Sequence, residues 1–173
     1  MVKEASEHGL NNLVLAGVEL KPKEQSVFLL RVQGYTTEDI ALIRGVARGT
    51  IARQIHNIAL KAKRNNESSA QRVMAQMAVE AVVRGMVLYD NLQSDPGFTK
   101  RQTEVAILML RGVDSSRVSE SFGFSRNNAK AYFTRIDRAL GVNNQAKWRF
   151  LERAGRLAYV GMQQVQASSS TLS

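Results

Sequence analysis

The chain has 173 residues and a mass of 19.2 kDa, with 24 Lys and Arg against 15 Asp and Glu, so its formal net charge is +9. It contains no Cys, which excludes a disulfide scaffold, a thiol nucleophile and zinc held by cysteines. With only two His, a histidine metal centre or a His-based triad is also poorly supplied. An excess of nine positive charges on a short chain favours a polyanionic partner, either nucleic acid or an anionic membrane.

The pattern of apolar residues argues against the membrane. The first residues lack the basic and apolar regions of a signal peptide. The most apolar stretch, residues 73–88, is interrupted by Gln76, Glu80 and Arg84, so it does not fit a membrane span. We expect a cytoplasmic, nucleoid-associated protein. The sequence also has no carboxylate pair, phosphate-cradling glycine loop or metal cluster, so we expect neither an enzyme nor a cofactor.

The chain contains an internal repeat. A shift of 78 residues aligns residues 20–66, the first copy, with residues 98–144, the second copy, without a gap. The repeated glycines matter most, because each marks a helix end or a turn that needs a positive φ. The identical pairs are Val27/Val105, Leu30/Leu108, Gly34/Gly112, Gly45/Gly123, Arg48/Arg126, Ile58/Ile136, Asn65/Asn143 and Asn66/Asn144.

In chain order, residues 1–19 come first, with apolar side chains at helical spacing over 9–19 that could form a helix. The first copy then predicts a helix ending at Gly34, a second helix capped by Thr37 and ended by Gly45, and a third with a buried stripe. That stripe consists of Ile51, Ile55, Ile58 and Ala62. The second copy repeats this order, with Ser115 and Ser125 as caps and a stripe of Ala129, Phe133, Ile136 and Leu140.

A longer helix is expected after each copy. Residues 67–93 form one, capped by Ser68 or Ser69, and either complete the first domain or also connect the copies rigidly. Residues 144–166 form the other. The predicted fold is all-α, with two tandem helix-turn-helix domains over 20–93 and 98–166, a linker over 94–97 and a disordered tail over 167–173.

The two copies resemble the LuxR/GerE-type DNA-binding domain. The resemblance is most specific in the second copy, at Leu140-Gly141-Val142-Asn143-Asn144-Gln145-Ala146, and in the first copy Gly49-Thr50-Ile51 is similar to the start of the recognition helix. The resemblance implies that Ala52, Arg53 and His56, and likewise Lys130, Ala131 and Thr134, face the major groove. The first copy departs from the family at Ala47, where a Ser cap is usual, and at Lys63-Arg64. The copies are therefore not expected to read the same bases.

The candidate DNA-binding residues lie on the two third helices and their first turns. Arg53 is the strongest candidate for a base contact, because an Arg can bond a guanine edge with two hydrogen bonds. Arg48 and Arg126 lie in the first turns, where a cation opposes the helix dipole unless a phosphate is near, so they are candidate phosphate contacts. The full set is Arg48, Thr50, Arg53, His56, Asn57, Lys61 and Arg64 in the first copy and Arg126, Asn128, Lys130, Thr134 and Arg135 in the second.

Two functions fit this sequence. The leading hypothesis is a regulator of transcription, acting as an activator, that binds specific double-stranded DNA through both copies and touches RNA polymerase. The alternative is a protein-interaction module that binds RNA polymerase or a LuxR-type regulator and reads few bases. The acid-free run from Arg44 to Arg64 favours the first hypothesis, whereas the altered motif of the first copy favours the second. A homodimer is compatible with either.

Overall fold

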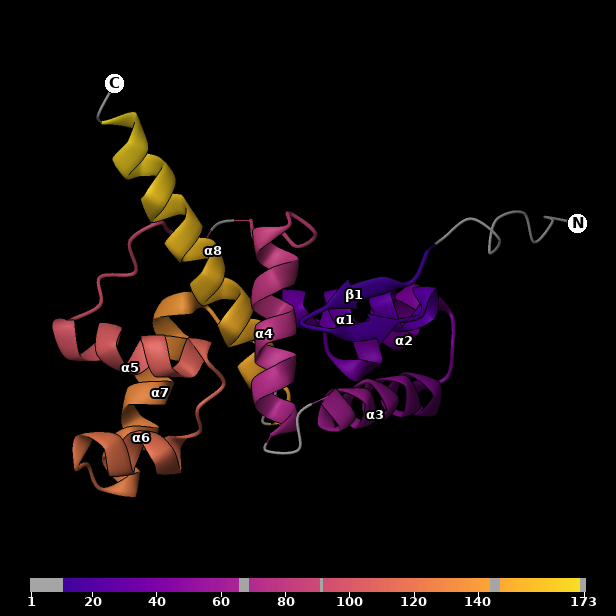
Figure 1. The fold of residues 1–173 in the computed structure, drawn as a ribbon, viewed down its shortest axis with the longest axis horizontal. Helices are drawn as coiled ribbons and strands as arrows, with labels where there is room; N and C mark the ends of the chain where they lie inside the picture. Colours follow the sequence, from indigo (N-terminus) through magenta and orange to yellow (C-terminus); the bar gives the residue numbers. More distant parts are fainter. Residues whose placement is uncertain (1–10, 66–68, 91, 144–146, 172–173) are drawn as a thin grey trace, which may run out of the picture.

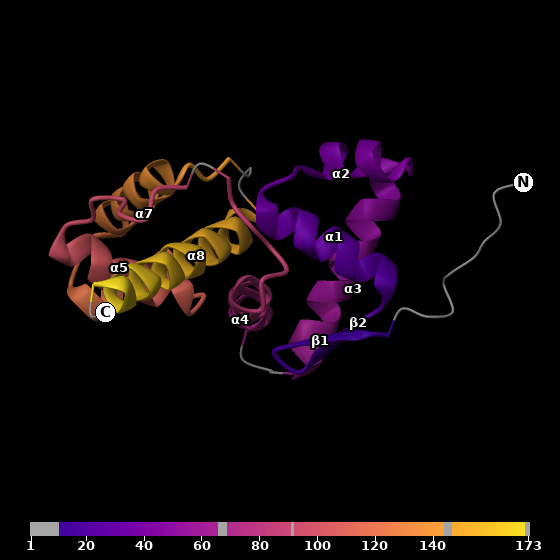
Figure 2. The ribbon, with the colours of Figure 1, turned by 90° about the horizontal axis from the view of Figure 1, so that it is seen from above.

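The computed structural model describes residues 11–65, 69–90, 92–143 and 147–171. Within these residues it contains a two-stranded hairpin and eight α-helices (Figures 1 and 2). The hairpin and α1–α4 lie on one side of the molecule, and α5–α7 lie on the other, with α8 running between them (Figure 2). The elements are β1 (Leu13–Leu15), β2 (Val18–Leu20), α1 (Pro22–Gln33), α2 (Thr37–Arg44), α3 (Arg48–Asn65), α4 (Ala70–Val83), α5 (Lys100–Leu110), α6 (Ser115–Phe122), α7 (Arg126–Leu140) and α8 (Arg149–Ser170).

The helices of the two copies begin at matching positions. Helices α1, α2 and α3 are followed, 78 residues later, by the starts of α5, α6 and α7. The buried positions match as well, because both copies place apolar side chains at the same sites between their three helices. Buried pairs are Val27/Val105, Ile40/Val118, Ile51/Ala129, Ile58/Ile136 and Ala62/Leu140.

The repeated glycines have the backbone conformation that the repeat predicts. Gly34 and Gly45 have φ of 105° and 62°, and Gly112 and Gly123 have φ of 74° and 67°. These values lie in the left-handed region, which side chains other than glycine adopt at a cost. Each glycine therefore lets one helix end and the next begin within a short turn.

Two of the predicted helix caps lie one residue too late. Helix α2 is capped by Thr36 rather than Thr37, because the Thr36 hydroxyl accepts a hydrogen bond from the Asp39 amide. The Asp39 carboxylate accepts in return from the Thr36 amide and hydroxyl, and these bonds hold the pKa of Asp39 below its ordinary value. Helix α6 is capped by Asp114 rather than Ser115. The caps predicted at Ser125 and, for α4, at Ser69 are confirmed.

Part of the N-terminal segment is a hairpin, so the helix expected over residues 9–19 is wrong, although the described chain is mostly helical, as predicted. Strands β1 and β2 pair antiparallel, with Leu13 opposite Leu20. The two turn residues, Ala16 and Gly17, both have positive φ, as a type I′ turn requires. The side chains alternate between buried and exposed with a period of two, which a helix cannot reproduce. Residues 9 and 10 of the expected helix lie outside the described residues.

The connection between the copies also differs from the prediction. Helix α4 ends at Val83, because Gly85 adopts a φ of 72° and the Met86 amide bonds back to the Ala81 carbonyl. The described residues of the connection, 84–90 and 92–99, therefore link the copies without a helix, in place of a helix to residue 93 and a linker over 94–97. Helix α8 continues to Ser170, so most of the tail that the sequence assigned to disorder is helical.

The copies share one core through α8. Leu151, Ala154 and Ala158 of α8 lie in the cluster that holds Phe28 and Met77 from the first half of the chain. Two other residues of α8, Leu157 and Val160, lie in the cluster of the second copy. A helix with apolar residues on two faces must be covered on both, so α8 joins the two copies into one packed body.

We predict that Gly112→Ala destabilises the protein more than Gly123→Ala. Both substitutions impose the same backbone strain, about 1–2 kcal/mol. Only at Gly112 does an added Cβ meet backbone, 2.8 Å from the Cα of Arg72 in α4, whereas nothing lies within 4 Å at Gly123. Crowding of this kind adds about 1–3 kcal/mol. Urea unfolding of the two variants measures the difference, and equal losses would show that α4 does not pack against this turn.

Candidate nucleic-acid interface

Helix α3 presents a mainly polar face, with Leu60 also exposed on it, that the described part of the chain does not cover. The predicted buried stripe is confirmed, because Ile51, Ile55, Ile58 and Ala62 are all buried against α1, α2 and α4. The opposite face holds Arg53, His56, Asn57 and Arg64, which are exposed, and so is Thr50 in the first turn. The helix contains no acidic residue. Its free face therefore combines cations with hydrogen-bonding groups, the composition that suits phosphates and base edges.

Lys61 also belongs to α3, but its ammonium group already binds two neighbouring groups of the protein. Its Nζ lies 2.6 Å from the Glu24 carboxylate and 3.1 Å from the Glu19 carbonyl oxygen. The Glu24 side chain is 10% exposed and also accepts from the Lys21 amide at the start of α1. Lys61 thus balances a nearly buried carboxylate and attaches α3 to α1. The structure does not place it on the free face with Arg53.

Arg48 also has a partner, although an exposed one. Its Nε lies 2.9 Å from the Glu38 carboxylate of α2, and the two side chains are 73% and 57% exposed. Ion pairs this exposed contribute little to stability and exchange easily with other ligands. Arg48 therefore stays accessible to a phosphate, whereas Lys61 does not.

Three further cations lie beside this face. They were not among the DNA-binding residues predicted from the sequence. Lys21 and Lys23 flank the start of α1, and they share a hollow of about 400 Å³ with Gln54 and Asn57 of α3. Arg44, at the end of α2, donates to the Lys23 carbonyl and so lies at the same edge. The signal in the sequence is the Lys-Pro-Lys run at a helix start, where an exposed helix N-terminus already attracts anions.

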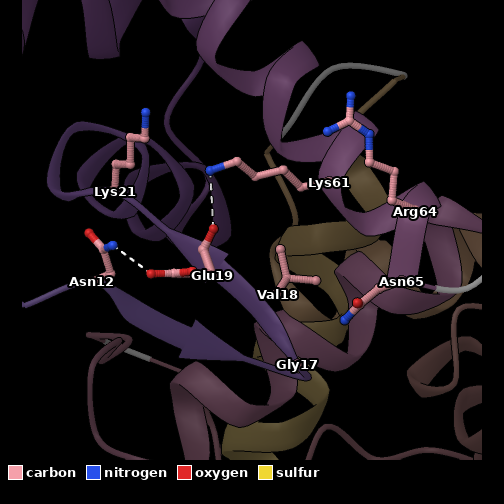
Figure 3. A pocket seen from close by; sticks show the side chains of 8 residues that line it. All are labelled: Asn12, Gly17, Val18, Glu19, Lys21, Lys61, Arg64 and Asn65. Carbon is pink, nitrogen blue, oxygen red and sulfur yellow. Dashed lines mark hydrogen bonds between the residues drawn. The ribbon is translucent and has the colours of Figure 1, made fainter.

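A second hollow of about 290 Å³ lies between the hairpin and the end of α3 (Figure 3). Figure 3 shows Lys61 reaching from α3 to the backbone of Glu19, with Lys21 and Arg64 as the other cations of the lining. The Glu19 carboxylate accepts a hydrogen bond from Asn12 instead. Lys21 and Arg64 are both exposed, so they extend the cationic surface of α3 toward the hairpin.

Helix α7 presents the corresponding face of the second copy. Ala129, Ile136 and Leu140 are buried as predicted, and Phe133 is half-buried. The Thr134 hydroxyl donates to the Lys130 carbonyl, so only its oxygen lone pairs remain for another partner. Lys130 and Thr134 line a hollow of about 440 Å³ with Gln71 of α4 and Arg149 of α8. The predicted residues Arg126, Asn128, Lys130, Thr134 and Arg135 are all exposed.

The turn before α7 is bordered by aromatic side chains, whereas the turn before α3 has none at the matching positions. The rings of Phe122 and Phe124 stack at 5.3 Å, and Phe124 stacks on Tyr132 at 5.0 Å. Arg101 lies over two of these rings and pairs with Glu104, so it is not a free cation. Tyr132 is thus a residue at the edge of the core. The first copy has Arg44, Val46 and Gln54 at the three aromatic positions.

Other kinds of site are not evident in the described part of the chain. No group of three or more His, Asp or Glu side chains there could hold a metal ion. Among the described helices, none combines the length and the apolar character that crossing a membrane requires.

Comparison with known families agrees with the geometry of the first copy. Residues 12–61, which run from the hairpin through α3 as far as Lys61, match the family model described as "Sigma-70, region 4". This is a DNA-binding helix-turn-helix family and not a class of enzymes. No curated protein and no solved structure matches the chain. The first part of this chain is therefore similar to a DNA-binding helix-turn-helix domain of the transcription machinery.

Proposed function

We propose that this protein is a regulator of transcription that binds specific double-stranded DNA through two LuxR-like helix-turn-helix units, α1–α3 and α5–α7. The observation that carries the proposal is the free face of α3. Arg53, His56 and Asn57 are exposed on a helix without acids, while Glu24 and Glu38 pair with the flanking cations. Carboxylates that would repel phosphates are thus neutralised next to the surface that would meet DNA.

The two units divide the work unequally in this proposal. The first unit places three further cations, Lys21, Lys23 and Arg44, around the face of α3. The second unit offers Asn128, Lys130 and Arg135 on α7, next to a turn stabilised by stacked rings. The first unit then supplies most of the phosphate contacts, and the second adds base contacts of a different specificity.

An activator also needs a contact with the polymerase, and α2 offers a candidate surface. Leu42 is 84% exposed and Ile43 is 55% exposed, whereas Ile40 and Ala41 on the same helix are buried. The second copy has Glu120 and Ser121 at the two exposed positions. The helix-turn-helix fold therefore does not require apolar residues at these two positions. Because exposed apolar patches often bind other proteins, we assign this surface to RNA polymerase. If α3 read no bases, the same surface would support the alternative function, a protein-interaction module.

Substitution of one Arg or Lys on each reading helix tests the DNA proposal. Selection from random duplexes with the full chain is expected to enrich two motifs. Arg53→Ala is expected to relax one motif and Lys130→Ala the other, each with a loss of about 1–3 kcal/mol on the selected duplex. Arg111→Ala, an exposed Arg at the end of α5, is the control and leaves both motifs unchanged. Equal binding of all duplexes by every variant would contradict the proposal.

Lys61 and Arg64 are expected to separate stability from binding. Lys61→Ala leaves the nearly buried Glu24 carboxylate without its cation, so the free energy of unfolding falls by about 1–3 kcal/mol. Arg64→Ala leaves stability unchanged but removes one phosphate contact, which lowers the salt dependence of binding by about one unit in slope. Urea unfolding and binding titrations at several salt concentrations measure the two effects. A stable Lys61→Ala variant with a reduced slope would show that Lys61 contacts DNA after all.

Leu42→Glu is expected to separate polymerase binding from DNA binding. The second copy already has Glu at this position, so the substitution is compatible with the fold. We expect the variant to keep its affinity for the selected duplex and to lose binding to purified RNA polymerase. Titration of the variant over immobilised duplex and over immobilised polymerase measures the two affinities. Polymerase binding unchanged in the variant would remove α2 from the proposed contact. Polymerase binding by a wild-type chain that selects no duplex would favour the protein-interaction module.

A further inference from the structure

Helix α8 approaches the first copy so closely that one position has no space for a side chain. Gly155 is buried in the middle of α8. An added Cβ there would overlap the Tyr89 hydroxyl and lie 2.8 Å from Cγ1 of Val32 in α1. The backbone at Gly155 is ordinary helix, so the requirement is one of space and not of φ. Glycine is therefore what lets α8 lie directly against α1.

Tyr89 fixes the same contact from the connecting segment. Its hydroxyl donates a 2.6 Å hydrogen bond to the Val32 carbonyl. Its ring meets Tyr159 of α8 edge-on at 5.6 Å and lies under the Arg156 guanidinium at 4.8 Å. Burial raises the pKa of this phenol, so the hydroxyl remains a donor at physiological pH. One side chain thus attaches both α1 and α8 to the segment that links the copies.

Glu152 connects the two copies one turn earlier on α8. Its carboxylate is fully buried and accepts from the Asn143 amide, which follows α7, and from the Arg156 guanidinium. On its other side it packs against the turn after α1, because a Cβ on Gly34 would lie 2.5 Å from Oε1. A buried carboxylate is stable only where such partners stay in place, so this contact favours one arrangement of the copies.

We propose that Gly155, Tyr89 and Glu152 are positioning residues that hold α3 and α7 at one fixed separation and orientation. The chain then recognises two half-sites on duplex DNA only at one spacing. The proposal rests on the function proposed above, and it adds the geometric rule for the target. Two helix-turn-helix units on a flexible linker would accept many spacings, whereas units that share a core accept few.

The first test measures the arrangement without DNA. Because the chain has no cysteine, Lys63→Cys on α3 and Ala139→Cys on α7 introduce one pair of spin labels. We expect one narrow distance distribution in this double variant. Adding Gly155→Ala should broaden or shift it, and Tyr89→Phe in the same chain should partly restore it by removing the overlapping hydroxyl. Gly161→Ala is the matched control on α8, because nothing lies within 4 Å of its added Cβ, and it should change nothing.

The second test measures the spacing on DNA. The wild-type chain selects from random duplexes, and the spacing between the two enriched motifs is then counted. We expect one dominant spacing, with binding to that duplex reduced at least tenfold by an insertion of about 5 bp, since half a helical turn places the second motif on the opposite face. Gly155→Ala should enrich the same motifs with several spacings and lose most of the penalty for the insertion. Circular dichroism confirms that each variant remains helical.

The outcomes distinguish the two proposals. A broad wild-type distance distribution, or one that Gly155→Ala leaves unchanged, would overturn the positioning role. Two enriched motifs without a preferred spacing would overturn it as well, while leaving the proposed function intact. A library with no enriched motif, together with a narrow distance distribution, would overturn the proposed function and the spacing rule, but not the rigid arrangement of the copies. If Gly155→Ala fails to fold, Tyr89→Phe in the otherwise wild-type chain replaces it in both tests. This variant loses the hydrogen bond to the Val32 carbonyl, so we expect it to broaden the distance distribution and the range of selected spacings.

Discussion

The close contact of α8 with α1 and α4 holds the two copies together. Each copy has only three helices, and two of the buried clusters, the one that holds Phe28 and Met77 and the one of the second copy, include residues from α8. Small cores bury too little apolar surface to be stable alone, so a shared helix stabilises both copies together. The contact needs a residue without a side chain at its tightest point, which Gly155 supplies, and a donor for a helix carbonyl, which Tyr89 supplies.

The electrostatic pattern of the first copy follows from how its acids are placed. Glu24 both bonds the amide of Lys21 and balances Lys61, and Asp39 completes the cap of α2. Glu38 pairs with Arg48 at the surface. These acids thus cap helix ends or form ion pairs, and none of them lies on the exposed face of α3. The exposed side of α3 therefore carries cations with no acid on the same helix, where they can act on a polyanion.

The two copies share their helix positions but differ in the turn that joins their second and third helices. In the first copy this turn is bordered by Arg44 and an exposed Val46, and in the second by Phe122 and Phe124 stacked on Tyr132. Stacked rings rigidify a turn without adding charge, whereas basic residues add charge without rigidity. The same backbone can therefore support different surface chemistry, and the match to "Sigma-70, region 4" covers residues 12–61 of the first copy.

Local features of this protein follow from the order of its amino acids. The matching glycines predicted where helices end, because positive φ is a property of the residue, and the spacing of Ile51, Ile55 and Ile58 predicted the buried face of α3. The same reasoning failed at the hairpin, where Leu13, Val14 and Val18 fit a helical spacing as well as a strand, and only packing against α3 and α4 selects the strand. Tertiary structure alone decided that Lys61 is occupied by Glu24 and that Gly155 lies against Tyr89, since these partners are separated by many residues in the chain. Contacts of that kind depend on how helices pack, and no local pattern records them.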